Sequence, residues 1–207
     1  MLSICSAYLA SNCLLENAIV PTNLAKSPNV EVEQYFCRGK RDYFNYKLSS
    51  ALTNFYHALR RDPHYGNIYF FRGNSYVLLG DLPNAIANFN FLLRLKPDFS
   101  NAHLVYANRG SAYARSGNYR AAIADYTQSI KLNGSTPLVR ENRGFAYYFS
   151  GSPQAAIADF QAEGRLFRFK FPQMMELIEA VRHQDESKIK TIWPIVAPNR
   201  GQEMKGC

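Results

Sequence analysis

An Arg-Gly-x-x-Tyr pattern recurs along this chain at a nearly fixed period, and most of the remaining sequence is arranged around it. The full pattern starts at Arg72, Arg109 and Arg143, and a degenerate copy starts at Arg38. Successive Arg-Gly pairs are 34, 37 and 34 residues apart. Self-similarity at such a period is typical of helical hairpins stacked in an array, in which each repeat contacts only its neighbours.

Each copy places small residues at the same register of two predicted helices. The expected structural columns are Gly39, Gly73, Gly110 and Gly144 in the first helices, Tyr76, Tyr113 and Tyr147 three residues after the last three of these glycines, and Ala51, Ala85, Ala122 and Ala156 in the second helices. Residues three or four apart share a helix face. A glycine inside a helix costs about 1 kcal/mol relative to alanine. Its recurrence therefore indicates that two helix axes approach closely at that register.

These residues and spacings resemble the tetratricopeptide repeat (TPR) family, whose Gly, Tyr, Ala, Phe and Pro columns fall at the same places. The resemblance implies an all-α fold, a right-handed α-solenoid of TPR helical hairpins with capping helices at both ends. Three repeats are clear and one is degenerate. The predicted four-repeat domain covers 32–170, divided into 32–65, 66–99, 103–136 and 137–170.

The flanks of the repeats are interpreted from their apolar pattern alone. We expect an N-terminal capping helix and loop over 1–31, C-terminal capping helices over 171–197 and a flexible tail over 198–207. The lone tryptophan, Trp193, is expected to pack on the last repeat as part of the C-terminal cap. The N-terminal helix could alternatively be a targeting segment, although it lacks the basic start of a signal peptide.

Composition narrows the function class. The 207 residues carry a net charge of +8, which bears on association rather than on fold. Four cysteines without a Cys-x-x-Cys pair favour free thiols and a reducing compartment, so a cytoplasmic location is expected. No stretch approaches the roughly 18 apolar residues that span a membrane.

The sequence offers little that resembles a catalytic or metal site. The four histidines occupy different registers of different repeats and have no His or Cys partner one helical turn away; they are His57, His64, His103 and His183. The chain has neither a phosphate-binding loop nor a nucleophile elbow. We therefore expect a protein that is not an enzyme and that holds no cofactor and no metal.

In the TPR family the first helices line the concave face of the superhelix, so residues flanking the glycine column are the candidate partner-binding residues. They are Phe36, Lys40, Tyr43, Phe70, Asn74, Asn108, Ser111, Arg115, Phe145 and Tyr148. Aromatic side chains are common hot spots of protein interfaces. The predicted partner is a peptide or helical segment of another protein with apolar anchors, and the predicted role is a scaffold or adaptor. Some of these residues could instead pack only against the neighbouring hairpin.

Two further alternatives stay open at this stage. The basic surface could bind RNA or another polyanion, although its Lys and Arg residues are spread over all repeats. The arginine column could form structural ties to Asp125 and Asp159, or it could form a ladder that binds a ligand.

Overall fold

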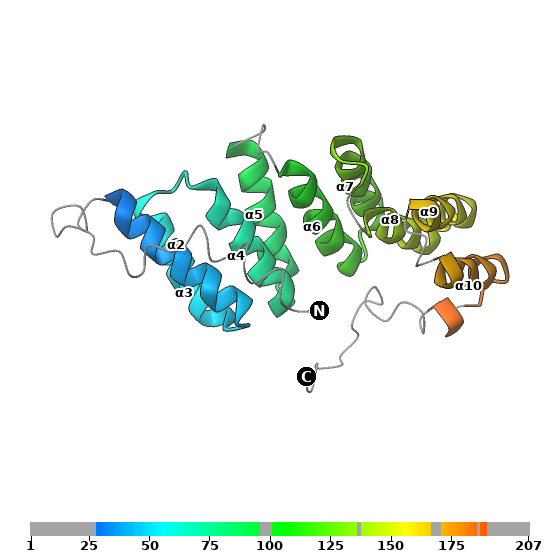
Figure 1. Cartoon of the computed structure of the whole chain (residues 1–207), viewed down its shortest axis with the longest axis horizontal. Coiled ribbons are helices and arrows are strands. Elements are labelled where there is room, and N and C mark those ends of the chain that lie inside the picture. The colour runs from blue at the N-terminus through cyan, green and yellow to red at the C-terminus, as the bar shows by residue number, and fades with distance from the viewer. Residues whose placement is uncertain (1–27, 96–100, 136–137, 167–170, 186, 190–207) are drawn as a thin grey trace. The chain divides into compact units, whose positions relative to one another are not determined.

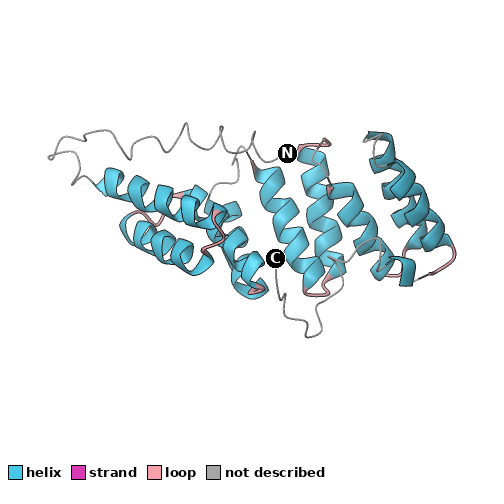
Figure 2. Ribbon diagram, turned by 60° about the horizontal axis from the view of Figure 1, so that its bottom comes forward, coloured by secondary structure: helices cyan, strands magenta, loops and turns pink. Residues whose placement is uncertain are grey.

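The computed structural model describes residues 28–95, 101–135, 138–166, 171–185 and 187–189. These residues form helices joined mainly by tight turns (Figures 1 and 2). The helices are α2 (Pro28–Phe44), α3 (Leu48–Arg61), α4 (Gly66–Leu79), α5 (Leu82–Leu95), α6 (Ala102–Arg115), α7 (Tyr119–Leu132), α8 (Val139–Phe149), α9 (Pro153–Leu166) and α10 (Phe171–Arg182). The predicted all-α fold of helical hairpins is confirmed. The expected N-terminal cap up to residue 27, the tail 198–207 and Trp193 lie outside the described residues.

The chain divides into two compact units, Met1–Gly80 and Asp81–Cys207. The boundary falls inside the repeat predicted for 66–99, between α4 and α5. The single four-repeat domain and its superhelical hand therefore stay predictions, and each unit is described by itself.

In the first unit, α2 and α3 pack together as a hairpin, and α4 packs on both of them. One side of α3 is buried through Ala51, Phe55 and Ala58, as their three- and four-residue spacing predicts. The degenerate copy of the repeat thus forms the same kind of hairpin as α6–α7 and α8–α9.

The turn between α2 and α3 places Tyr46 where the other copies have a glycine. Gly80, Gly117 and Gly151 adopt left-handed backbone with φ of 80°, 82° and 86°, and Tyr46 adopts it with φ of 56°. A side chain in this conformation costs roughly 1–2 kcal/mol, whereas glycine adopts it freely. The first hairpin therefore keeps the turn geometry of the other copies at an energetic cost.

In the second unit, neighbouring helices pack in chain order from α5 to α10, with the closest pairs α6–α7 and α8–α9 (Figure 1). The last helix, α10, covers α9 and buries Leu177, Ile178, Ala180 and Val181. Met175 lies nearly opposite the centre of this apolar face at 100° per residue, and it is 41% exposed.

In three copies of the repeat, the glycine column brings the first helix against an aromatic ring of the second helix. A Cβ atom added to Gly39 would lie 2.4 Å from the ring of Phe55, and one added to Gly144 would lie 2.5 Å from the ring of Phe160. At Gly110 the corresponding distance to Tyr126 is 2.9 Å. No side chain fits in this space, so the separation of the paired helices depends on the glycines.

Two arginines of the column each connect three helices. Arg109 donates two hydrogen bonds of 2.7 Å to the carboxylate of Asp125 on α7 and one of 2.6 Å to Asn90 on α5. Arg143 donates two hydrogen bonds of 2.7 Å to Asp159 on α9 and one of 3.0 Å to Thr127 on α7. These bidentate pairs are structural ties, both within a hairpin and to the preceding second helix.

A tyrosine three residues before the arginine accompanies three copies of the column. The guanidinium carbon lies 5.9 Å from the ring centre of Tyr35 at Arg38, 5.1 Å from Tyr69 at Arg72 and 5.4 Å from Tyr106 at Arg109. The hydrogen bond to Asp159 raises the pKa of Arg143, whereas burial lowers the pKa of Arg72. Sixteen residues after Arg72 the chain has Asn88 in place of the aspartate found in the third and fourth copies.

We predict that Gly144→Leu lowers the free energy of unfolding by at least about 2 kcal/mol, because the new side chain meets a buried ring. Gly134→Leu is the control, since a Cβ atom there makes only ordinary contacts, 3.5 Å from the flexible end of Arg140 and 3.7 Å from the carbonyl oxygen of Ile130. Urea denaturation of both variants measures the difference. Equal stabilities would contradict the close approach at Gly144.

Tyr46→Gly is expected to raise the free energy of unfolding by up to about 1 kcal/mol, because it removes the left-handed strain. The side chain is 78% exposed, so its removal loses little buried surface. Gly117→Ala, which introduces the same strain, is expected to act in the opposite direction. A lower melting temperature of Tyr46→Gly would show that this turn is not strained.

Arg143→Met is predicted to cost about 3 kcal/mol, because it leaves the carboxylate of Asp159 buried without its cation. The double variant Arg143→Met with Asp159→Leu should recover most of this loss. Arg61→Met, which removes an exposed pair with Glu31, serves as the control and should have little effect. A double variant as unstable as the single one would mean that the arginine stabilises the unit by packing alone.

Candidate functional site

The candidate partner-binding residues fall into two groups, one in each unit. The first unit holds Phe36, Lys40 and Tyr43 on α2 with Phe70 and Asn74 on α4. The second unit holds Asn108, Ser111 and Arg115 on α6 with Phe145 and Tyr148 on α8.

In the first unit an aromatic cluster joins α2, α3 and α4 around Phe71. The ring of Phe71 lies 5.6 Å from Tyr43 and 6.1 Å from Phe44, centre to centre, and 5.5 Å from Phe70. Phe44 is 45% exposed, and Phe71, Tyr43 and Phe70 are half-buried. The cluster therefore presents aromatic edges to solvent. Phe71 was missed from the sequence because it lies next to a predicted site residue but outside the registers used.

A lysine ammonium caps this aromatic cluster. The Nζ atom of Lys40 lies 5.4 Å from the ring centre of Phe36 and 5.6 Å from that of Phe71. Burial raises the pKa of Tyr43, with a smaller contribution from Tyr46, so its phenol stays protonated at neutral pH. A neutral phenol beside a cation suits a partner that brings an apolar side chain and a hydrogen-bond acceptor.

Two of the predicted contact residues are buried and must be corrected. Phe36 is 6% exposed, and Phe145 is fully buried with its ring 5.0 Å from that of Phe160. Phe36 lies three residues before Gly39, only about 60° around the helix from it. Phe145 follows Gly144 directly, and its ring is long enough to reach the second helix. Both side chains therefore belong to the core of their units.

On α6 the polar candidates are half-buried. The hydroxyl of Ser111 donates to the carbonyl of Ala107 at 3.1 Å and accepts from the phenol of Tyr126 at 3.1 Å. Ser111 thus serves the α6–α7 hairpin, and we remove it from the candidate surface. Asn108 and Arg115 stay candidates.

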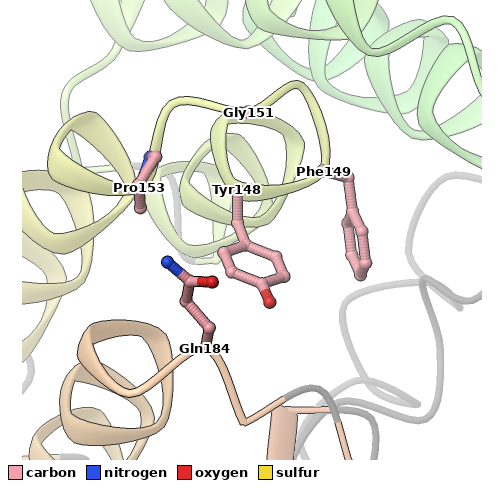
Figure 3. A pocket seen from close by; sticks show the side chains of 5 residues that line it. All are labelled: Tyr148, Phe149, Gly151, Pro153 and Gln184. Carbon is pink, nitrogen blue, oxygen red and sulfur yellow. The ribbon is translucent and has the colours of Figure 1, made fainter.

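The second unit has an open hollow at the carboxyl end of α8. Its volume is about 440 Å³, and it is lined by Tyr148, Phe149, Gly151, Pro153 and Gln184 (Figure 3). The side chains of Tyr148 and Gln184 approach one another across it, and Phe149 projects beside Tyr148 (Figure 3). The hollow combines aromatic surface with an amide and a phenol, the mixture that recognises apolar segments with a few polar groups.

Neighbouring rings hold the aromatic wall of this hollow in place. Phe149 stacks on Tyr119 of α7 at 5.5 Å and meets Tyr148 edge to face at 5.3 Å. Tyr148 was predicted from its register. Gln184 was not, because it comes from the turn after α10, where the repeat pattern gives no signal. This turn has left-handed backbone at Gln184, with φ of 52°.

No group of three or more His, Cys, Asp or Glu side chains within the described ranges could hold a metal ion. No helix in the described part of the chain is both long and apolar enough to cross a membrane.

The chain was compared with known proteins. Residues 110–151 match the family model of the TPR repeat. No curated protein matches the sequence. Two solved structures of MamA are similar. One MamA crystal structure has a TM-score of 0.68 at 17% identity, over 81% of this chain and 88% of that one. MamA 41-end from Desulfovibrio magneticus RS-1 has a TM-score of 0.67 at 15% identity, over 80% and 90%.

A third similar structure is YrrB, described as a TPR protein with an unusual peptide-binding site. It has a TM-score of 0.63 at 17% identity, over 82% of this chain and 94% of that one. At these identities the likeness concerns the fold. The chain thus contains a match to the TPR repeat at 110–151, and its fold is similar to that of MamA and YrrB.

Proposed function

We propose that this chain is a non-enzymatic scaffold that binds a peptide or helical segment of another protein on the surface of its first helices. The observation that carries this proposal is the open aromatic hollow at Tyr148 and Phe149. A hydrophobic surface of this kind, rimmed by polar groups, is typical of a protein interaction site. The peptide-binding site named for YrrB, a protein of similar fold, is consistent with the same use of the repeat.

The partner segment should carry apolar side chains as anchors. In the second unit, Tyr148 and Phe149 would contact such a side chain, and Asn108 and Arg115 would bind polar groups of the partner. In the first unit, Tyr43, Phe44 and Phe70 would bury apolar groups, with Lys40 and Asn74 on the polar side. Each unit therefore offers its own aromatic surface, and either surface could act by itself.

RNA binding was the alternative drawn from the charge of +8. Neither the family match nor the similar structures support it, and exposed aromatic edges fit an apolar protein segment as well as a base. Binding to a polyanion would fall steeply with salt, because each neutralised phosphate releases counterions. Binding through apolar anchors depends much less on salt. Salt dependence therefore separates the two functions.

We predict that Phe70→Glu with Tyr148→Glu abolishes capture of protein partners from lysate, because a carboxylate cannot be buried against an apolar anchor. Affinity capture with mass spectrometry, with and without nuclease and at two salt concentrations, measures this. Tyr56→Glu is the matched control, since Tyr56 on the second helix α3 is 53% exposed.

Circular dichroism must show equal helicity for the variants. Partners retained by the double variant but lost from Tyr56→Glu would move the site to the second helices. Captured material that disappears with nuclease would replace the proposed function by nucleic-acid binding.

A further inference from the structure

The hollow at the end of α8 lies where the chain itself continues past the repeats. One of its walls is Gln184, which directly precedes the final described turn. Tyr148, Phe149 and Pro153 supply the apolar walls. The segment that follows Gln184 therefore starts at the rim of the hollow.

The chain is held close to the hollow after it passes Gln184. The carboxylate of Asp185 accepts hydrogen bonds from the hydroxyl of Ser187 at 2.9 Å and the backbone N–H of Lys188 at 3.0 Å. These bonds close a short helical turn that includes Ile189. Ile189 is 1% exposed and belongs to the same apolar core as Phe145 and Phe160. The next residues thus leave from a fixed point on this unit.

The sequence beyond Ile189 provides a suitable occupant. Residues 192–196 read Ile-Trp-Pro-Ile-Val and contain Trp193, the only tryptophan of the chain. Trp193 follows Ile189 by four residues, a stretch that spans at most about 14 Å. A residue before proline is biased toward extended backbone. The segment therefore has the character of an extended peptide with an aromatic anchor.

We propose that Trp193 from the chain's own C-terminal segment occupies the hollow lined by Tyr148, Phe149, Pro153 and Gln184. The indole ring packs against the two aromatic rings and the proline, and its N–H donates to the side-chain carbonyl of Gln184 or the hydroxyl of Tyr148. A buried tryptophan needs such an acceptor, and this hollow supplies two.

This docking bears on the proposed function, because Tyr148 is also a proposed partner-binding residue. A tethered segment competes at an effective concentration in the millimolar range. A partner that uses the hollow then binds with an affinity reduced by the fraction of hollows already filled. The segment is thus a built-in competitor of an apolar partner at the second unit.

The lone tryptophan makes the docking directly measurable in the purified chain. We expect the Trp193 emission to be blue-shifted relative to N-acetyltryptophanamide and protected from quenching by acrylamide. Tyr148→Glu should shift the emission to the red and remove the protection. Tyr56→Glu, on an exposed surface of the other unit, should leave both unchanged.

Gln184→Ala is a second variant, at an exposed residue, in case Tyr148→Glu alters the fold. It should also shift the emission to the red, because it removes one wall of the hollow and one acceptor of the indole N–H. A solvent-exposed tryptophan in the wild type would overturn the proposal. So would a protected tryptophan that responds to neither variant, since it would then be buried elsewhere.

The fluorescence result does not depend on any partner, so its failure is separable from failure of the proposed function. Lysate capture by Trp193→Ala adds a distinct measurement. Docked Trp193 together with unchanged capture would refute competition while leaving the self-contact in place. Exposed Trp193 together with capture that depends on Tyr148 would refute the docking and leave the scaffold function standing.

Discussion

The contact between a first-helix glycine and a second-helix aromatic ring sets the geometry of the hairpins α2–α3, α6–α7 and α8–α9. At Gly39 and Gly144 the ring occupies the space in which any side chain would begin. With the helix axes this close, the buried alanines of the second helix, such as Ala51 and Ala156, complete the contact without leaving a void. Side chains one turn away on the first helix then either pack on the second helix or face away from it. Those that face away form the candidate binding surface.

The arginine column fixes how successive hairpins of the second unit meet. Arg143 holds Asp159 within its own hairpin and Thr127 on the preceding second helix, so a single guanidinium crosses the joint between repeats. Both charges are largely removed from water, so the stability of the pair depends on its bidentate hydrogen bonds. The interpretation of this column as a ligand ladder is therefore not needed for Arg109 and Arg143. Their polar groups are already engaged inside the unit.

Much of the fold could be predicted from the sequence, because period and small-residue register are local properties. Even the first turn, which has Tyr46 in place of the expected glycine, takes the geometry of the turns in the other copies. The candidate site was harder to predict, because the angular position of a residue on its helix does not show how far its aromatic ring extends. Phe36 and Phe145 were placed on the open side, yet each ring reaches back into its hairpin. Gln184 gave no signal at all, since its position depends on how α10 packs on α9.

The arginine joints also determine how the second unit comes apart. In repeat proteins, stability is approximately a sum of terms for each repeat and for each joint between neighbours. A desolvated ion pair at a joint makes the free energy of that joint a large part of the total stability. When one hairpin unfolds, the guanidinium of the neighbouring hairpin therefore loses a hydrogen-bond partner. From α5 to α9 the helices should consequently exchange their amide hydrogens as one cooperative block, without fraying repeat by repeat.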